Sequence, residues 1–411
     1  MDLNFRSFKY QKLRTSGLFL PTIIYLHPMP LFLLILALLL LTYGGLIDFF
    51  RRAWEALPFF NNKEAKEPFT LISVIISLRN EEKNIPGLLE SLAGQSYPKH
   101  LFEVILVDDH SEDKSWDLLN SFDYKSMKHQ VISLAAILQQ NGELKSYKKK
   151  ALETAIQHAT GNLIVATDAD CRFEKDWLLT ISQYYETTGA KFIAAPVKII
   201  PTKTFVGIFQ LLDFISLQGI TAAAVFKKKL SMCNGANLAY EKAAFEEVGG
   251  FAGIDKIASG DDMLLMHKIY LKYPDKVVYL KHSSAIVSTA AVNSWKEFFQ
   301  QRIRWASKAT HYQDKRIFWV LLLVYLVNVC FGILLVMAFF NSTALFFFFL
   351  LLIGKWLLEQ PFMASVSSFY GQSKYMIWFP LMQPVHILYT IVAGWLGQFG
   401  QFEWKGRRVK K

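Results

Sequence analysis

The sequence predicts an α/β domain carried between membrane-spanning helices. Apolar runs long enough to cross a bilayer stand near both ends of the 411-residue chain. Between residues 69 and 285, short apolar runs alternate with helical patterns, an order typical of parallel β-α-β units. Two acidic pairs directly follow two of these runs, at the edge where parallel sheets bind their ligands.

Composition narrows the class of protein. The chain is 52% hydrophobic with a formal net charge of +11, which suits a polytopic membrane protein carrying a soluble domain. The positive charge favours contact with anionic lipid or nucleotide phosphate, and nothing in the sequence supports nucleic acid binding. The three cysteines are far apart, and the nine histidines show no zinc spacing, so neither a disulfide framework nor a zinc site is indicated.

The first apolar run, Pro30–Phe50, has about the 20 residues needed for one span. Arg51 and Arg52 follow it in place of a cleavage site, so we expect an uncleaved anchor at 28–50 with the next domain in the cytoplasm. The tail at 1–27 is also basic, and the charge pattern alone leaves the orientation open.

We expect a second membrane region at 317–399, followed by a basic tail at 400–411. Its three apolar runs are Ile317–Phe340, Thr343–Gln360 and Tyr375–Phe399. Pro380 and Pro384 lie in the last run, which is therefore either broken or re-entrant. Three full spans would place the tail outside the cell, and two spans with a re-entrant segment would return it to the cytoplasm.

Six runs are predicted as strands of a sheet covered on both faces, because they are almost continuously apolar. They are Thr70–Ser77, Phe102–Val107, Gln130–Ala136, Asn162–Thr167, Lys191–Pro196 and Val277–Leu280.

Acidic side chains follow the second and fourth of these strands. "VDDHS" places Asp108 and Asp109 just past one strand, and "TDADC" places Asp168 and Asp170 just past the other. Crowded carboxylates at one edge are costly unless a cation or a hydrogen-bonding ligand holds them, and a D-x-D there suits Mg²⁺ or Mn²⁺. A solvated turn is the alternative interpretation of a single D-x-D.

A third acidic pair, Asp261 and Asp262, stands in "SGDDMLLMHKI" at the start of a helical pattern. Carboxylates are favourable at any helix N-terminus. A carboxylate beside a diphosphate pocket also suits a general base that takes a proton from an incoming hydroxyl. Both interpretations stay open at this point.

These motifs together resemble the inverting family 2 glycosyltransferases, in their membrane-bound branch with a Gln-x-x-Arg-Trp motif. The ordered set is "SVIISLRNEE", "VDDHSEDKS", "YKKKALETAI", "TDADC", "GDDMLL" and "QRIRW", and it extends from about Ser73 to Trp305. The resemblance implies a GT-A fold at 69–285, with transmembrane helices before and after it. It also implies a nucleotide-diphosphate sugar bound through Mg²⁺ or Mn²⁺.

Several site residues follow from the resemblance. It assigns Ser77, Asp108 and Asp109 to the nucleotide and Lys148 to the donor phosphates, unless the lysine run is a solvated helix face. It assigns Asp168 to the donor, Asp170 to the metal and Asp262 to catalysis, and the sequence has Asp261 where the family has glutamate. Asn234 and Gly235 match a segment beside the acceptor, although a turn explains them equally well.

The motif "QRIRW" lies in a predicted interfacial helix at 293–312. Gln301, Arg304 and Trp305 match the family motif, and Gln300 and Arg302 are additional. Under the resemblance, Arg304 stabilises the leaving diphosphate and Trp305 forms a wall for the acceptor. Anchoring at the lipid interface is the alternative role for these residues.

We therefore expect a multi-pass enzyme of the plasma membrane with its catalytic domain in the cytoplasm. It would transfer a hexose with inversion from a nucleotide sugar, UDP being favoured by the resemblance, to a hydroxyl of a membrane lipid. About four spans are few for a polysaccharide channel, so a processive synthase of a β-linked polymer, with a growing glycan as acceptor, is the alternative. A non-catalytic nucleotide-sugar sensor is a third possibility, disfavoured by Asp170, Asp262 and Arg304 being present.

Overall fold

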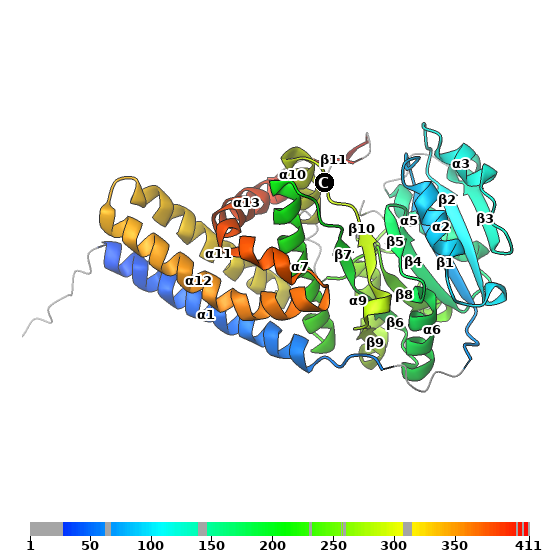
Figure 1. Cartoon of the computed structure of the whole chain (residues 1–411), viewed down its shortest axis with the longest axis horizontal. Coiled ribbons are helices and arrows are strands. Elements are labelled where there is room, and N and C mark those ends of the chain that lie inside the picture. The colour runs from blue at the N-terminus through cyan, green and yellow to red at the C-terminus, as the bar shows by residue number, and fades with distance from the viewer. Residues whose placement is uncertain are drawn as a thin grey trace, which may run out of the picture.

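The computed structural model contains an α/β domain attached to one end of a bundle of long helices (Figure 1). It describes residues 28–61, 67–138, 146–229, 232–255, 257, 260–306, 315–399, 402–404 and 407–409. The predicted N-terminal tail at 1–27 lies outside these residues, as do parts of the predicted tail at 400–411.

Seven strands form the main sheet, in the order β3-β2-β1-β4-β8-β6-β9. Their bounds are β1 Ile72–Leu78, β2 Phe102–Asp108, β3 Lys128–Ser133, β4 Leu163–Asp168, β6 Phe192–Ala194, β8 Leu238–Glu241 and β9 Val277–Tyr279. All six predicted strands are present. The sheet is mixed, however, because β8 runs antiparallel to both β4 and β6.

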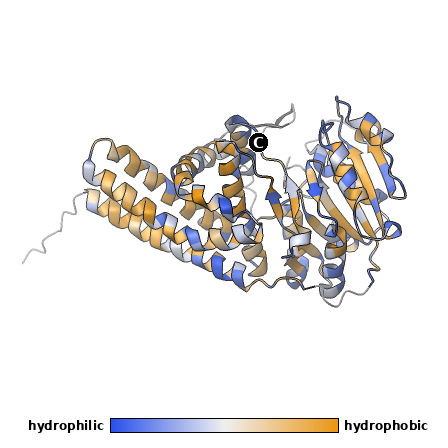
Figure 2. Cartoon of the chain, in the orientation of Figure 1, coloured by the Kyte–Doolittle hydropathy of each residue, from blue (hydrophilic) through white to orange (hydrophobic). Residues whose placement is uncertain are grey.

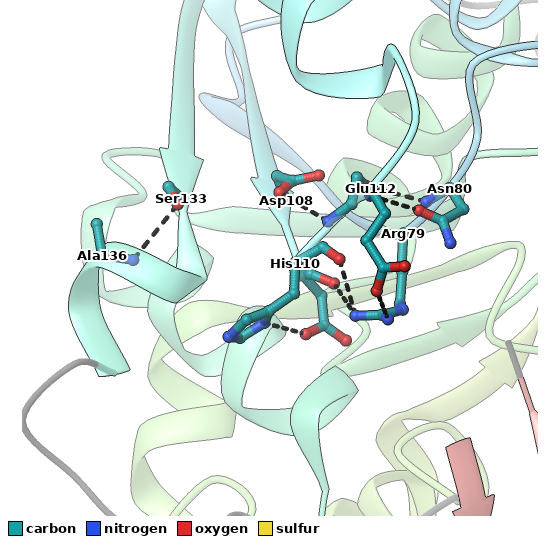
Figure 3. A network of polar contacts seen from close by, with 9 residues as sticks. Arg79, Asn80, Asp108, His110, Glu112, Ser133 and Ala136 are labelled. Atoms are coloured by element: carbon teal, nitrogen blue, oxygen red, sulfur yellow. Dashed lines mark hydrogen bonds and ion pairs between the residues drawn. The ribbon is translucent and has the colours of Figure 1, made fainter. Parts of the chain in front are cut away.

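Two strand predictions are corrected in detail. The third strand ends at Ser133, three residues before the predicted end, and helix α4 (Leu134–Leu138) follows. There the Ser133 hydroxyl accepts a hydrogen bond from the backbone N–H of Ala136 at 3.4 Å, a local bond that competes with the strand ladder (Figure 3). β8 lies in a segment whose sequence suggested a turn and a helix start.

A second sheet of three short strands was not predicted. It has the order β5-β10-β7, with β5 Cys171–Phe173, β7 Val197–Ile199 and β10 Val287–Thr289. Strand β5 begins directly after the D-x-D turn and pairs with β10. This pairing fixes the turn between the two sheets.

Helices cover both faces of the main sheet. They are α2 Ile85–Ala93, α3 Ser115–Ser121, α5 Tyr147–His158, α6 Trp177–Thr188, α8 Lys242–Glu247 and α9 Met263–Lys272. Because side chains alternate along a strand, Val74 and Ile76 enter one core while Ile75 enters another. The core that contains Ile75 continues into the helical bundle. The α/β domain and the bundle therefore share one hydrophobic core.

Five described helices are long and apolar enough to cross a membrane: Met29–Ala56, Phe205–Phe226, Lys315–Ala338, Ser342–Phe369 and Ser373–Gly397. They correspond to α1 Pro28–Ala56, α7 Phe205–Phe226, α11 Lys315–Ala338, α12 Ser342–Phe369 and α13 Phe379–Phe399 with the turn before it. Apolar residues predominate along these helices (Figure 2).

Helix α7 is the one of these five described helices that was not among the four predicted spans. Of its most apolar stretch 78% is buried, against 22–28% in the other four helices. It contacts α1 and α12 and runs across them next to the α/β domain (Figure 1). The sequence prediction had included this segment in the α/β domain, and the structure shows it as the layer where domain and bundle meet.

The last predicted span is interrupted near its start, but not at its prolines, because α13 continues through Pro380 and Pro384. A turn of 3₁₀ helix at Ser373–Trp378 precedes α13, which packs on α11 and on α10 (Trp295–Ala306). The short strands β11 Phe402–Trp404 and β12 Arg407–Val409 pair beyond it, and β11 contacts α10. The C-terminal strands therefore lie at the end of the bundle that carries the α/β domain (Figure 1).

Lys281 joins the end of α1 to the α/β domain. Its Nζ donates to the carbonyl oxygens of Trp54 at 2.8 Å and Leu57 at 3.3 Å, and lies 4.0 Å from the Trp54 ring centroid. Burial lowers the pKa of Lys281 to about 8. A lysine so placed satisfies carbonyl groups at the helix end.

A buried carboxylate joins β1, β2 and the turn before β4. Glu103 accepts hydrogen bonds from the Ser73 hydroxyl at 2.7 Å and the Thr160 N–H at 2.6 Å, and pairs with Lys128 at 2.8 Å. Gly161 lets the chain pass here, because a Cβ on it would lie 2.5 Å from the Ser73 nitrogen. Burial alone would raise the pKa of Glu103, but its hydrogen-bond partners lower that pKa to about 2.

We predict that Glu103→Gln lowers the free energy of unfolding at pH 7 by about 2 kcal/mol. Because the folded-state pKa is depressed, the stabilisation is present above about pH 4.5 and is lost toward pH 2. Thermal unfolding in detergent at pH 7 and pH 3 should show the gap between variant and wild type narrowing. Glu153→Gln, on a half-buried pair with Lys150 in α5, is the control. A gap that does not depend on pH would contradict the prediction.

Candidate active site

The predicted acidic edge exists, because β2, β1 and β4 are parallel and end together. In this register Ser77 lies beside Asp168, and Leu78 lies beside Asp108. Ser77 and Asp168, which are 91 positions apart in the sequence, are thus neighbours at this edge of the sheet. The carboxyl ends of parallel strands are where such sheets bind ligands.

The loop after β2 is held by hydrogen bonds from Arg79 to its backbone, and one oxygen of the Asp108 carboxylate beside it makes no hydrogen bond to a described residue. Arg79 donates to the carbonyl oxygens of Asp109 at 3.1 Å and His110 at 2.8 Å (Figure 3). Asp108 is buried and accepts from the Ser111 N–H at 3.2 Å through Oδ2, while its Oδ1 has no hydrogen-bond partner among the described residues. A buried acceptor without a donor costs about 1–3 kcal/mol, so this oxygen is suited to a ligand N–H or O–H.

Lys148 stands at the centre of the acidic residues. From the first turn of α5, its Nζ lies 2.8 Å from Asp168 Oδ1 and 3.3 Å from Asp261 Oδ2. Burial alone would lower the pKa of Lys148, but the charges of Asp168, Asp261 and Asp262 outweigh burial and raise that pKa. The interpretation of the lysine run as a solvated face is therefore wrong for Lys148.

Asp262 takes the helix-capping role that was considered from the sequence. It stands just before α9, where its Oδ1 accepts from the Met263 N–H at 2.7 Å, and its Oδ2 accepts from the Gly235 N–H at 3.3 Å. A Cβ on Gly235 would lie 3.6 Å from both Asp261 Oδ2 and Lys148 Nζ. Asp262 thus caps a helix and belongs to the same cluster as Lys148. The Asn234 side chain accepts from the Ala236 N–H at 3.0 Å and shapes the adjoining turn.

Asp170 stays the predicted ligand of a divalent cation. Its Oδ2 accepts from the Thr289 hydroxyl of β10 at 3.0 Å, whereas Asp168 is engaged by Lys148. No group of three or more His, Cys, Asp or Glu side chains in the described part of the chain could hold a metal ion. This donor set fits Mg²⁺ or Mn²⁺ bound by one or two carboxylates, with substrate phosphates and water completing the shell.

Arg304 of α10 is close enough to these carboxylates for their charges to affect its pKa. Burial lowers the pKa of its guanidinium, while the charges of Asp168, Asp261, Asp262 and Asp170 act in the opposite direction. The predicted motif arginine is therefore within electrostatic range of all four carboxylates. A cation held there can stabilise negative charge on a bound phosphate group.

The other two motif residues have different surroundings. Gln301 Oε1 accepts from Gln210 Nε2 of α7 at 3.4 Å and from an Arg302 nitrogen of its own helix at 3.1 Å. The Trp305 ring lies 6.3 Å from the Phe214 ring of α7, measured between centroids, and 4.2 Å from the Arg302 guanidinium carbon. Arg302 is only 3% exposed and pairs with Asp213.

Sequence reasoning missed Arg302 and Asp213. Arg302 was considered additional to the motif. Asp213 is the one charged side chain in the apolar run of α7. A lone acidic residue in such a run is a signal of function or pairing, and it could have identified this contact.

A cavity of about 930 Å³ extends from the acidic cluster into the bundle. Asn234, Asp262 and Trp305 line it on the side of the α/β domain. Its remaining wall comes mainly from α1, α7, α11, α12 and α13, which contribute largely apolar residues. Asp262 therefore belongs both to the acidic cluster and to the lining of a cavity within the helical bundle.

Comparisons with known proteins agree with this architecture. A model of glycosyl transferase family 2 matches residues 73–249, and one of glycosyl transferase family group 2 matches residues 163–396, more than half of the chain. The chain is 27% identical over 252 residues to "Probable glycosyltransferase YdaM" of Bacillus subtilis, covering 59% of this chain and 56% of that protein. It is 26% identical over 133 residues to a beta-monoglucosyldiacylglycerol synthase of Trichormus variabilis, covering 32% and 27%.

A solved structure shares the fold over most of the chain. It is the mannosyltransferase PcManGT from Pyrobaculum calidifontis in complex with GDP-Man and Mn²⁺, at a TM-score of 0.57 and 18% identity. The match covers 89% of this chain and 98% of that one. The matches to the two curated relatives span little more than half and about a quarter of their lengths.

We predict that Lys148→Gln lowers donor turnover at least about 100-fold, because Asp168, Asp261 and Asp262 lose the cation between them. Turnover is measured as nucleotide released from a nucleotide sugar. Lys150→Gln is the matched control, since Lys150 lies in the same turn and pairs with Glu153 away from the cluster. Unchanged turnover in a folded Lys148→Gln protein would contradict this role.

Proposed function

The chain belongs to glycosyltransferase family 2, and from that premise we propose that it transfers one sugar from a nucleotide-diphosphate donor to a hydroxyl of a membrane lipid. The acidic edge is the proposed donor site. The cavity that begins at Asp262 is the proposed acceptor site. This cavity is the observation that carries the proposal.

The depth of the cavity supports a lipid acceptor. Tyr43, Leu46, Ile47 and Phe50 of α1 line it, and α1 ends at Ala56. At 1.5 Å per residue, the cavity extends about 9–20 Å along α1 from that end. A molecule that reaches Asp262 by this route has its remainder among apolar side chains of five helices. A lipid fits such a site, because its hydroxyl and its chains need opposite environments.

The proposed reaction is a single displacement. Asp262 takes the proton of the acceptor hydroxyl, the oxygen forms a bond to the anomeric carbon, and the bond from that carbon to the diphosphate breaks on the opposite face. The anomeric configuration is inverted. Arg304 stabilises the charge that grows on the departing diphosphate. When bound beside Asp170, Mg²⁺ or Mn²⁺ would add positive charge to the diphosphate.

The donor nucleotide is proposed to lie along the ends of β1 and β2. Ser77, Asp108 and Asp109 stand there, and the unused Oδ1 of Asp108 offers an acceptor for a base or ribose donor group. Lys148 and Asp168 would then contact the diphosphate side of the donor. UDP remains our proposed nucleotide, and the solved relative contains GDP-Man, so both nucleotides belong in the assay.

We propose that the α/β domain faces the cytoplasm. Arg51 and Arg52 lie near the end of α1 that meets this domain, and Lys315 and Arg316 begin α11 after α10. Basic residues flanking membrane spans favour the cytoplasmic side.

The first test uses detergent-purified protein with Mn²⁺, membrane lipid extract and radiolabelled UDP- and GDP-sugars. We expect label in a discrete lipid spot on thin-layer chromatography. In Asp262→Asn, which keeps the shape but not the charge, we expect transfer to fall about 10³-fold. Label in a lipid-free polymer of high mass would overturn the proposal and indicate a processive synthase instead.

A second test narrows the cavity. Leu217→Trp on α7 adds bulk to its wall and should lower transfer to lipid about tenfold, because the acceptor loses space, while nucleotide release to water persists. Leu357→Trp is the matched control, since Leu357 is 56% exposed on the outside of α12. Equal transfer in both variants would exclude this cavity as the acceptor site.

A further inference from the structure

We propose that Arg302 is a positioning residue that holds the Trp305 indole at the acceptor cavity and is itself held by Asp213. The proposal rests on the proposed function, because Trp305 is taken to contact the acceptor. Arg302 and Trp305 both line the cavity, as do Asp213 and Tyr389.

Arg302 lies between aromatic rings of its own helix. Its guanidinium carbon is 4.7 Å from the Phe298 ring centroid and 4.2 Å from that of Trp305. One of its terminal nitrogens donates to Gln301 Oε1 at 3.1 Å. A guanidinium in contact with an indole face is a favourable cation–π arrangement, stronger where water is excluded. Arg302 thus contacts two residues of the motif: Gln301, which is next to it, and Trp305, which is three positions later.

The buried pair extends this contact to two other helices. Asp213 of α7 accepts from Arg302 through Oδ2, and through Oδ1 it accepts from the Tyr389 hydroxyl of α13 at 3.0 Å. The Arg302 and Asp213 side chains are 3% and 2% exposed. A buried ion pair adds little net stability but specifies one geometry, and charged residues within apolar helices commonly serve function. Here it specifies how α10 sits on α7 and α13.

Arg302 and Arg304 therefore have separate tasks. Side chains two positions apart on a helix are related by a rotation of about 200° around the helix axis, because each residue adds about 100°. They therefore point to nearly opposite sides. Arg304 lies within electrostatic range of the four carboxylates, and Arg302 faces the bundle, where Asp213 balances its charge. A change at Arg302 should consequently affect the acceptor through Trp305 and leave the donor edge intact.

The test is a double-mutant cycle that avoids leaving one buried charge alone. The paired variant Asp213→Asn/Arg302→Gln should raise the KM for the lipid acceptor about tenfold and keep nucleotide release to water within about twofold of wild type. In a Trp305→Ala background, the same pair should change the KM less than about twofold, because its effect passes through Trp305. The Arg302→Lys variant should have an acceptor KM between those of the wild type and the paired variant, since lysine keeps the charge but lacks the planar guanidinium.

Two controls exclude a purely structural effect. Lys191→Gln/Glu241→Gln neutralises an ion pair of the α/β domain away from the cavity and should retain wild-type kinetics. Acrylamide quenching of the Trp305 fluorescence, obtained as the difference from Trp305→Phe protein, should increase in the Asp213→Asn/Arg302→Gln protein without any acceptor present.

The outcomes separate the two proposals. Additive effects of the pair and Trp305→Ala, or unchanged quenching of Trp305, would overturn the role of Arg302. An equal loss of acceptor transfer and of nucleotide release would overturn it as well. Wild-type protein that glycosylates no lipid would refute the proposed function, and the quenching experiment would still decide whether Arg302 holds Trp305.

Discussion

The site depends on one ammonium group placed between carboxylates from distant parts of the chain. Lys148 lies 2.8 Å from Asp168 and 3.3 Å from Asp261, and Asp262 and Asp170 stand close by. Without a cation, four carboxylates at one sheet edge would repel each other strongly, since each also loses hydration there. With Lys148 and Arg304 present, the edge can be assembled before any substrate arrives. A diphosphate that binds here must then share these two cations with the protein's own carboxylates.

The arrangement of layers explains how this edge meets the bundle. The parallel strands of the main sheet place Ser77, Asp108 and Asp168 at one edge. The second sheet contacts Asp170 through Thr289. Helix α10 places Arg304 within electrostatic range of the same carboxylates. Helix α7 lies under α10 and crosses α1 and α12. Asp262 and Trp305 thus lie where the acidic edge adjoins the apolar cavity.

Sequence alone predicted the elements whose pattern is local and long. Six strands and the membrane helices at both ends follow from their apolar runs, and the acidic edge follows from the parallel register of the strands. Strands β5, β7 and β10 have three residues each and contain polar side chains (CRF, VKI and VST), whereas the equally short β6 (FIA) and β9 (VVY) lie in apolar runs. The antiparallel β8, the burial of α7 and the cavity depend on packing between distant segments. Arg302 was missed for the same reason, because its partner Asp213 lies 89 residues earlier.

The core shared by sheet and bundle has a consequence for how the protein folds. Ile75 and Ile105 of the sheet belong to the same apolar cluster as Leu40 of α1, Val366 of α12 and Met382 of α13. The helices that follow the domain in the chain are therefore part of the core to which the sheet belongs. Helix α12 contacts both α1 and α7, so a chain without it would leave apolar side chains of these two helices uncovered. We therefore expect the domain and the bundle to fold as one cooperative unit rather than as an independent enzyme joined to an anchor.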